Sequence, residues 1–130
     1  MKNHSFQVSE GTLRIDCTGT LDAATVRSIC DDVKAMPGRE GVRRAIVVTT
    51  AVADIVEAGK KELVNLQREL CATCRTAWVD ERARFRGVAL WVMHLAGDLN
   101  GKAVATMQQA EAWLSSSESR EDRANRAVGR

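Results

Sequence analysis

The chain of 130 residues has the length of one domain, since a chain of this size buries about two thirds of the surface that it exposes when unfolded. Apolar residues make up 45% and charged residues 28%, a balance that builds a hydrophobic core without disulfide or metal cross-links. The formal net charge of +2 is too small for a general attraction to nucleic acid or to an anionic membrane, so binding to either would need a local basic patch, and we expect no nucleic-acid partner.

No stretch approaches the roughly 20 apolar residues of a membrane span, and residues 1–5 lack the apolar segment of a secretory signal. We therefore expect a cytoplasmic protein without a membrane span. In that reducing compartment the four cysteines are expected to be free thiols rather than a disulfide framework.

Residues 6–17 predict a β-hairpin, and residues 22–36 predict the first helix. Apolar residues alternate with polar ones on both sides of the turn Glu10-Gly11, as in strands with one buried face. Asp22 is suited to cap the helix, and Pro37-Gly38 ends it. The apolar positions are Phe6, Val8, Leu13, Ile15 and Cys17 in the hairpin and Val26, Ile29, Val33 and Met36 in the helix.

An unbroken apolar run at residues 45–48 predicts a central strand that is covered on both faces. After an expected loop at residues 49–54, a second amphipathic helix continues to about Ala72. Its apolar stripe consists of Val56, Gly59, Leu63, Leu66 and Leu70, and its polar face of Lys60, Lys61, Glu62, Gln67 and Arg68.

The remaining elements are a strand at residues 76–79, a third helix ending at Asn100-Gly101, a weaker strand at residues 103–107 and a short last helix. The expected inward stripe of the third helix is Val88, Trp91, Val92, Leu95 and Leu99, and the last helix contains Ala110, Ala112, Trp113 and Leu114. We interpret all three tryptophans, the third being Trp78, as core packing, although one of them could wall a small pocket.

This order of elements predicts one α/β domain over residues 1–114, with a mixed sheet of about five strands and about four helices. Strands separated by helices pair in parallel through right-handed crossovers, whereas the hairpin adds an antiparallel pair. Residues 115–130 are charged and poor in large apolar side chains, so we expect a frayed or disordered tail.

Three stretches within this order carry a family resemblance. They are Gly19 to Thr25 at the passage from second strand to first helix, Arg75 to Leu95 with the fourth strand and third helix, and Glu111 to Leu114 in the last helix. Over about residues 5–114 the chain resembles the STAS fold of anti-sigma-factor antagonists, and more closely its SpoIIAA-like branch. A resemblance of this kind predicts a fold better than a function.

The resemblance implies a regulatory site at the start of the second helix, where classical members carry a serine or threonine that a partner kinase phosphorylates. Setting Gly59 on the family's glycine places Glu57 and Ala58 at the hydroxyl positions. Thr49 and Thr50 lie nearby, at the end of the preceding strand. We therefore predict that the classical phosphoacceptor is missing and that a carboxylate takes its place, which is favourable at a helix start.

The strongest short motif is Cys71-Ala72-Thr73-Cys74, whose spacing could serve thiol exchange or half of a zinc site. The expected position at a helix C-terminus disfavours a thiolate. The other candidate ligands, Cys17, Cys30, His4 and His94, are scattered over other elements. We interpret the pair as structural thiols and predict no metal site.

Three carboxylates, Asp54, Asp80 and Glu81, follow predicted strands, where ligands of open α/β sheets gather. They could hold magnesium beside a phosphate. The alternative, which we favour, is that each caps or flanks the helix that follows, because no glycine-rich phosphate loop accompanies them.

Arg82, Arg84 and Arg86 precede or begin the third helix and could bind an anion together with the helix amides. A solvated basic loop is the alternative that we favour, since Asp80 and Glu81 partly neutralise it.

His94 lies one position off the expected inward stripe of the third helix, so we expect it at the boundary of the core or at the surface.

We find no nucleophile elbow, Walker loop, zinc-protease helix or dinucleotide fingerprint, so we predict no catalytic residue and no cofactor. The favoured function is a non-enzymatic STAS-like regulatory or protein-interaction module, with a homodimer left open. Its predicted partner-binding residues are Thr49, Thr50, Asp54, Glu57 and Ala58. The alternative is a carrier or sensor whose helix faces part around a lipid-like or nucleotide-like molecule, and an enzyme built on the three carboxylates is a third hypothesis.

Overall fold

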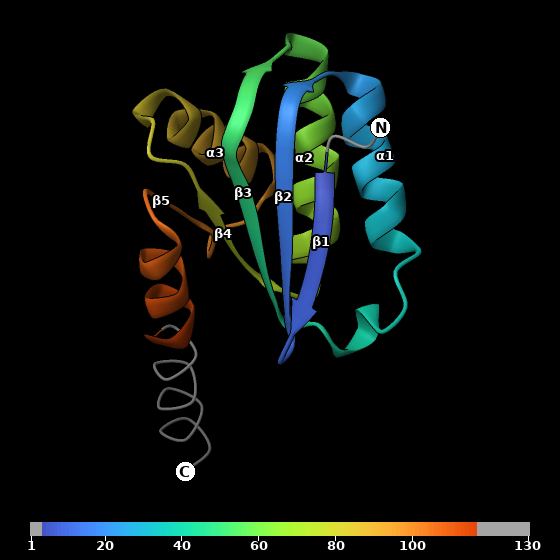
Figure 1. Ribbon diagram of the computed structural model, residues 1–130, viewed down its shortest axis with the longest axis vertical. Coiled ribbons are helices and arrows are strands. Elements are labelled where there is room, and N and C mark those ends of the chain that lie inside the picture. Colours follow the sequence, from blue (N-terminus) through green and yellow to red (C-terminus); the bar gives the residue numbers. More distant parts are fainter. Residues whose placement is uncertain (1–3, 117–130) are drawn as a thin grey trace.

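The computed structural model describes residues 4–116 and shows a five-stranded sheet with helices on both faces (Figure 1). The strands lie in the order β1-β2-β3-β4-β5, with β1 antiparallel to β2 and every other neighbouring pair parallel. The strands are β1 (His4–Ser9), β2 (Thr12–Leu21), β3 (Arg44–Ile55), β4 (Arg75–Val79) and β5 (Lys102–Val104). The helices are α1 (Ala23–Lys34), a short 3-10 turn η1 (Arg39–Gly41), α2 (Glu57–Cys71), α3 (Ala83–Ala96) and a last helix at 107–116.

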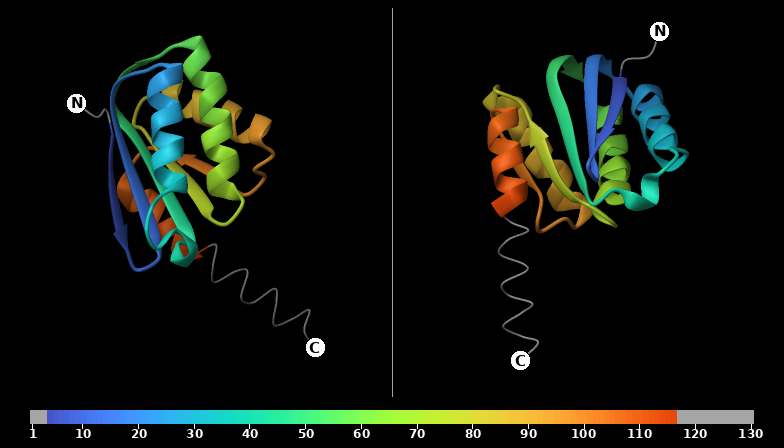
Figure 2. Two further views of the ribbon diagram at one scale, coloured as in Figure 1. Left: turned by 90° about the vertical axis from the view of Figure 1, so that its right-hand side faces the viewer. Right: turned by 60° about the horizontal axis from the view of Figure 1, so that its bottom comes forward.

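Each parallel strand is added on the same side of the previous one, so right-handed crossovers carry α1, α2 and α3 over one face of the sheet. The last helix lies on the opposite face (Figure 2). The α/β class, the mixed sheet and the hairpin are therefore confirmed, with β3 as the central strand.

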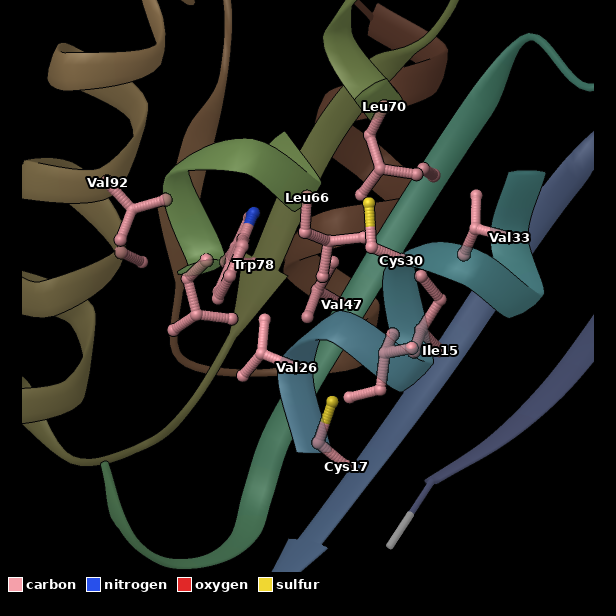
Figure 3. Close-up of a cluster of buried hydrophobic side chains, with 14 of the residues drawn as sticks. Ile15, Cys17, Val26, Cys30, Val33, Val47, Leu66, Leu70, Trp78 and Val92 are labelled. Carbon is pink, nitrogen blue, oxygen red and sulfur yellow. The ribbon is translucent and has the colours of Figure 1, made fainter. Parts of the chain in front are cut away.

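Alternation along the strands divides the core in two. On the side of the three helices, Ile15, Val47 and Trp78 of the sheet pack against residues such as Val26 and Leu66 (Figure 3). On the other side, β3, β4 and β5 pack against the last helix through Ile46, Val48, Ala77, Val79, Val104, Ala110 and Leu114. Because β3 is buried on both faces, its continuous apolar run is explained.

Three predicted boundaries are wrong: those of the loop at residues 49–54, of the third helix, and of the last strand, which ends at Val104 rather than at residue 107. Residues 49–54, expected as a loop, belong to β3, because β2 continues alongside and pairs with Ala51, Val52, Asp54 and Ile55 across two register shifts. The third helix ends at Ala96, not at residue 100, since Gly97 adopts a left-handed conformation (φ 77°) that terminates it. The last helix runs through residue 116, and the rest of the predicted tail, residues 117–130, lies outside the described residues.

Candidate functional site

The first turn of α2 lies against the end of β2. Val56 is extended, and its amide donates to the carbonyl of Leu21 at 3.2 Å. A Cβ atom on Gly59 would stand 2.1 Å from that same carbonyl oxygen. Only glycine allows this approach of helix to strand, so Gly59 sets the position of the residues before it.

Glu57 and Ala58 are consequently exposed at the helix start. The Glu57 side chain is 73% exposed and lies 3.6 Å from the Nζ of Lys60, one turn further along. The partial positive charge of the helix N-terminus favours a carboxylate at this position. An exposed carboxylate with Lys60 beside it therefore marks the surface at the start of α2.

A cleft of about 360 Å³ separates this turn from α3. Glu57 and Lys60 line it from α2, and Arg84, Gly87, Val88 and Trp91 line it from α3. Arg84 also reaches Asp54, at 3.7 Å between Nη2 and Oδ1. Asp54, Glu57 and Ala58, predicted from sequence to bind a partner, thus lie on one surface together with the rim of the cleft.

The outer face of α3 adds an apolar surface that sequence reasoning missed. Leu90, Trp91 and Leu95 are exposed, as is Leu99 just beyond the helix. The residues that face the core are Phe85, Ala89, Val92 and Met93, so the predicted inward stripe with Trp91, Leu95 and Leu99 is wrong. Residues 88–93 form a continuous apolar run, which is more than one buried stripe requires, and this excess was the available signal.

Thr49 does not belong to this surface. It is buried in β3 and donates a 2.8 Å hydrogen bond to the carboxylate of Asp80. Thr50 is exposed but lines a different cleft, with Val48 and Met107, on the face of the sheet that carries the last helix. The five predicted partner-binding residues are therefore divided among the helix start, the core and the opposite face.

Asp80 and Arg82 form a hydrogen-bonded ion pair at the carboxyl end of β4. Arg82 donates to Asp80 from Nε at 2.9 Å and from Nη2 at 2.8 Å, and it also donates to the carbonyls of Thr49 and Val52 on β3. Burial opposes ionisation of Asp80, yet the hydrogen bonds from Arg82 and Thr49 and the charge of Arg82 together lower its pKa. The pair ties the connection between β4 and α3 to the end of β3.

The three carboxylates considered as an alternative magnesium site do not come together, and the residues that the structure describes contain no group of three potential metal ligands. Asp80 flanks α3 as expected, because its side chain accepts from the backbone N–H of Arg82, the N-cap residue. Asp54 caps no helix: it lies within β3, and the N-cap of α2 is Val56, which makes no side-chain cap bond.

Of the three arginines considered for anion binding, two donate to protein acceptors. Arg82 is held by Asp80, and Arg86 donates to the carbonyls of Asp80 and Glu81. The Arg84 side chain is 78% exposed. Anion binding by the three together stays a prediction from sequence.

The cysteines are free thiols. Cys71 is the last residue of α2, and Cys74 is buried with its Sγ 3.6 Å from the carbonyl oxygen of Val42. Burial raises the pKa of Cys71 and raises that of Cys17 to about 12. Neither group is activated as a nucleophile.

Gln67 is a second buried polar residue, besides Thr49, that the sequence pattern misplaced. Gln67, expected on the polar face of α2, is fully buried. Of the tryptophans, Trp78 is in the main core, Trp113 is half-buried against the second core cluster, and Trp91 is exposed. His94 is exposed on α3, as expected.

No protein-family model matches the sequence, and the search of curated proteins found no match. Solved structures do match. A putative anti-sigma factor antagonist from Thermotoga maritima superimposes with a TM-score of 0.67 at 14% identity, covering 86% of this chain and 94% of that one. Unphosphorylated SpoIIAA, an anti-sigma factor antagonist, gives 0.60 at 19% identity, covering 84% and 93%.

Phosphorylated SpoIIAA from Bacillus gives a TM-score of 0.59 at 20% identity, covering 84% of this chain and 96% of that one. These likenesses establish the class of fold, an STAS-type α/β domain. Within that class the chain has the SpoIIAA-like fold of the anti-sigma factor antagonists, so the resemblance seen in the sequence is confirmed at the level of fold. No helix in residues 4–116 has the length and apolar character needed to cross a membrane.

Proposed function

We propose that the protein is a non-enzymatic regulatory module that binds a protein partner through the start of α2 and the cleft beside α3. The observation that carries this proposal is the exposed Glu57 in the first turn of α2, at the rim of a cleft with an aromatic wall. Trp91 and Arg84, which both line this cleft, belong to the residue types in which interface hot spots are enriched.

The charge at this helix start is permanent. Glu57 and Ala58 stand where the resemblance places the hydroxyl residues, and neither can accept a phosphate. Two of the related structures are of SpoIIAA without and with phosphate, so that protein changes its charge by modification. We infer that phosphorylation at these two positions does not switch this chain's binding to its partner.

A comparison of two charge reversals tests the proposal. Glu57→Lys is expected to weaken recovery of the partner from cell extract by about tenfold or more, since a charge at an interface rim affects both association rate and specificity. Glu111→Lys, the same change at an exposed position of the last helix, is the control. Equal recovery by the parent and Glu57→Lys, with both folded by circular dichroism, would refute the proposal.

A carrier or sensor of a small molecule is the second candidate, and one observation favours it. A cleft of about 460 Å³, lined partly by Val48, Val79 and Met107, lies between the sheet and the start of the last helix. This is a different place from the helix faces considered from the sequence. Native mass spectrometry of the purified protein decides, because a retained ligand adds mass and an interaction module without ligand has the mass of the chain.

A further inference from the structure

Neither a close contact nor the backbone conformation requires a glycine at position 87. It lies in the second turn of α3, where a Cβ atom would meet nothing within 4 Å, and its φ is not positive. Glycine in a helix interior is less favourable than alanine because it loses more backbone entropy on folding. Gly59 is required by a close approach within the chain, whereas Gly87 faces open space.

Gly87 belongs to an exposed apolar ridge. Residues four apart lie in one row along a helix, and the row through Gly87 continues with Trp91, 40% exposed, and Leu95, 45% exposed. Leu90 is exposed beside this row. The row thus has a notch at its N-terminal end, a large ring in the middle and an apolar projection at its C-terminal end.

We propose that this ridge binds the same ridge of a second copy of the chain, with the two α3 helices antiparallel across a two-fold axis at Trp91. Gly87 and Leu95 are each four residues from Trp91, about 6 Å along the helix axis. A two-fold axis at Trp91 therefore places the partner's Leu95 over Gly87, and the same contact occurs twice, as an isologous interface requires.

The charges of α3 fit the antiparallel arrangement. The first turn contains Arg84 and no acidic residue, which is unfavourable beside the positive end of the helix dipole. Arg84 is 78% exposed, and its ion pair with Asp54 is long. Arg84 lies at one end of α3 and Trp91 near its middle, so in the antiparallel pair the arginine meets the negative C-terminal end of the partner's helix.

The second copy is preferred to an unrelated partner because one two-fold axis at Trp91 brings the projection onto the notch and Arg84 to the negative end of the partner's helix, twice each. The ridge shares Gly87 and Trp91 with the cleft of the proposed function, so variants at these two residues affect both proposals. Glu57 and Ala58, which lie outside the ridge, test the proposed function, and Leu95, which does not line the cleft, tests the dimer.

Sedimentation equilibrium of the full chain, from about 1 µM to about 1 mM, measures the dimer directly. We expect a reversible dimer whose dissociation constant rises at least about tenfold in Leu95→Glu, because a charge is then buried without a partner. Val8→Glu is the matched control: it puts the same charge on another exposed apolar residue, in β1, and is expected to leave the dimer unchanged.

Gly87→Ala distinguishes an effect on dimerisation from an effect on folding. We expect the substitution to weaken the dimer by filling the notch and, at concentrations where the chain is monomeric, to raise the melting temperature. Trp91→Cys in a Cys71→Ser background is expected to form a disulfide between copies under oxidation, since only residues near a two-fold axis meet themselves.

A chain that stays monomeric up to about 1 mM would overturn the dimer. A dimer that is sensitive to Val8→Glu and insensitive to Leu95→Glu would overturn it in favour of pairing through β1. If the chain is monomeric and Leu95→Glu instead abolishes its binding to a different protein, the dimer is refuted and the ridge is the binding site of that protein.

Discussion

The indole N–H of Trp78 donates a 2.8 Å hydrogen bond to Oε1 of Gln67, in the interior between β4 and α2. The other end of Gln67 is also used: its Nε2 donates to Thr76 at 2.7 Å and to Asp98 at 2.6 Å. Thr76 in turn donates to the same carboxylate oxygen of Asp98. One buried amide thus links a strand, a helix and the connection that leads from α3 to β5.

Loss of the Gln67 amide is expected to destabilise the protein. Gln67→Leu keeps much of the volume but leaves the indole N–H of Trp78 without its acceptor, which costs about 1–3 kcal/mol. The measurement is the free energy of unfolding from urea denaturation followed by Trp fluorescence. Lys61→Leu, at an exposed position of the same helix, is the control and is expected to change stability little. A Gln67→Leu variant as stable as the parent would contradict this account of the network.

Gly59→Ala is expected to destabilise by about 1–3 kcal/mol, the usual cost of forcing extra atoms into a packed site. The added methyl would overlap the carbonyl of Leu21, so α2 must move away from β2. Ala24→Gly, on the exposed face of α1, provides a comparison in which only helix propensity changes, by about 1 kcal/mol. The melting temperatures of both variants are compared with that of the parent. A Gly59→Ala protein that melts at or above the parent's melting temperature would show that α2 does not pack tightly against the end of β2.

Asp80 makes stability depend on pH in the acid range. Its pKa is lowered from the ordinary 3.8, so the folded state binds a proton less readily than the unfolded chain. The stabilisation is therefore fully present above pH 3.8 and is lost as the pH falls through the lower pKa of the folded state. Asp80→Asn is expected to be less stable than the parent at pH 7 and to approach it at low pH. A stability difference that does not change with pH would assign the effect to packing.

Thiol reactivity is expected to follow burial. Cys71 is partly exposed, whereas Cys17, Cys30 and Cys74 are buried. Because the pKa of Cys17 is raised to about 12 by burial, that thiol is protonated at neutral pH and should not react in the folded protein. Titration with a thiol reagent should show one faster group, which Cys71→Ser removes, and the remaining thiols only on unfolding. Rapid labelling of Cys17 in the native state would mean that the main core opens easily.

Some of the candidate site could be predicted from the sequence and some could not. The carboxylate at the start of α2 followed from the family resemblance, which set Gly59 on the family's glycine, and the structure supplies the physical reason for a glycine there, its close approach to Leu21. Thr49 was misplaced because a hydroxyl is compatible with both a loop and a buried strand, and only the neighbouring Asp80 satisfies it in the interior. Trp91 and Leu95 were misplaced because α3 carries apolar residues on more than one face, so periodicity alone could not choose which face is buried.

The sequence by itself determined the order of strands and helices, the α/β class and the two-sided burial of β3, because these follow from the local spacing of apolar residues along the chain. The tertiary structure alone decided which polar side chains are buried, which face of α3 stays exposed and where β3 ends. Those features depend on partners distant in the sequence: Gln67 is buried because Trp78, Thr76 and Asp98 satisfy it, and β3 is long because β2 continues beside it.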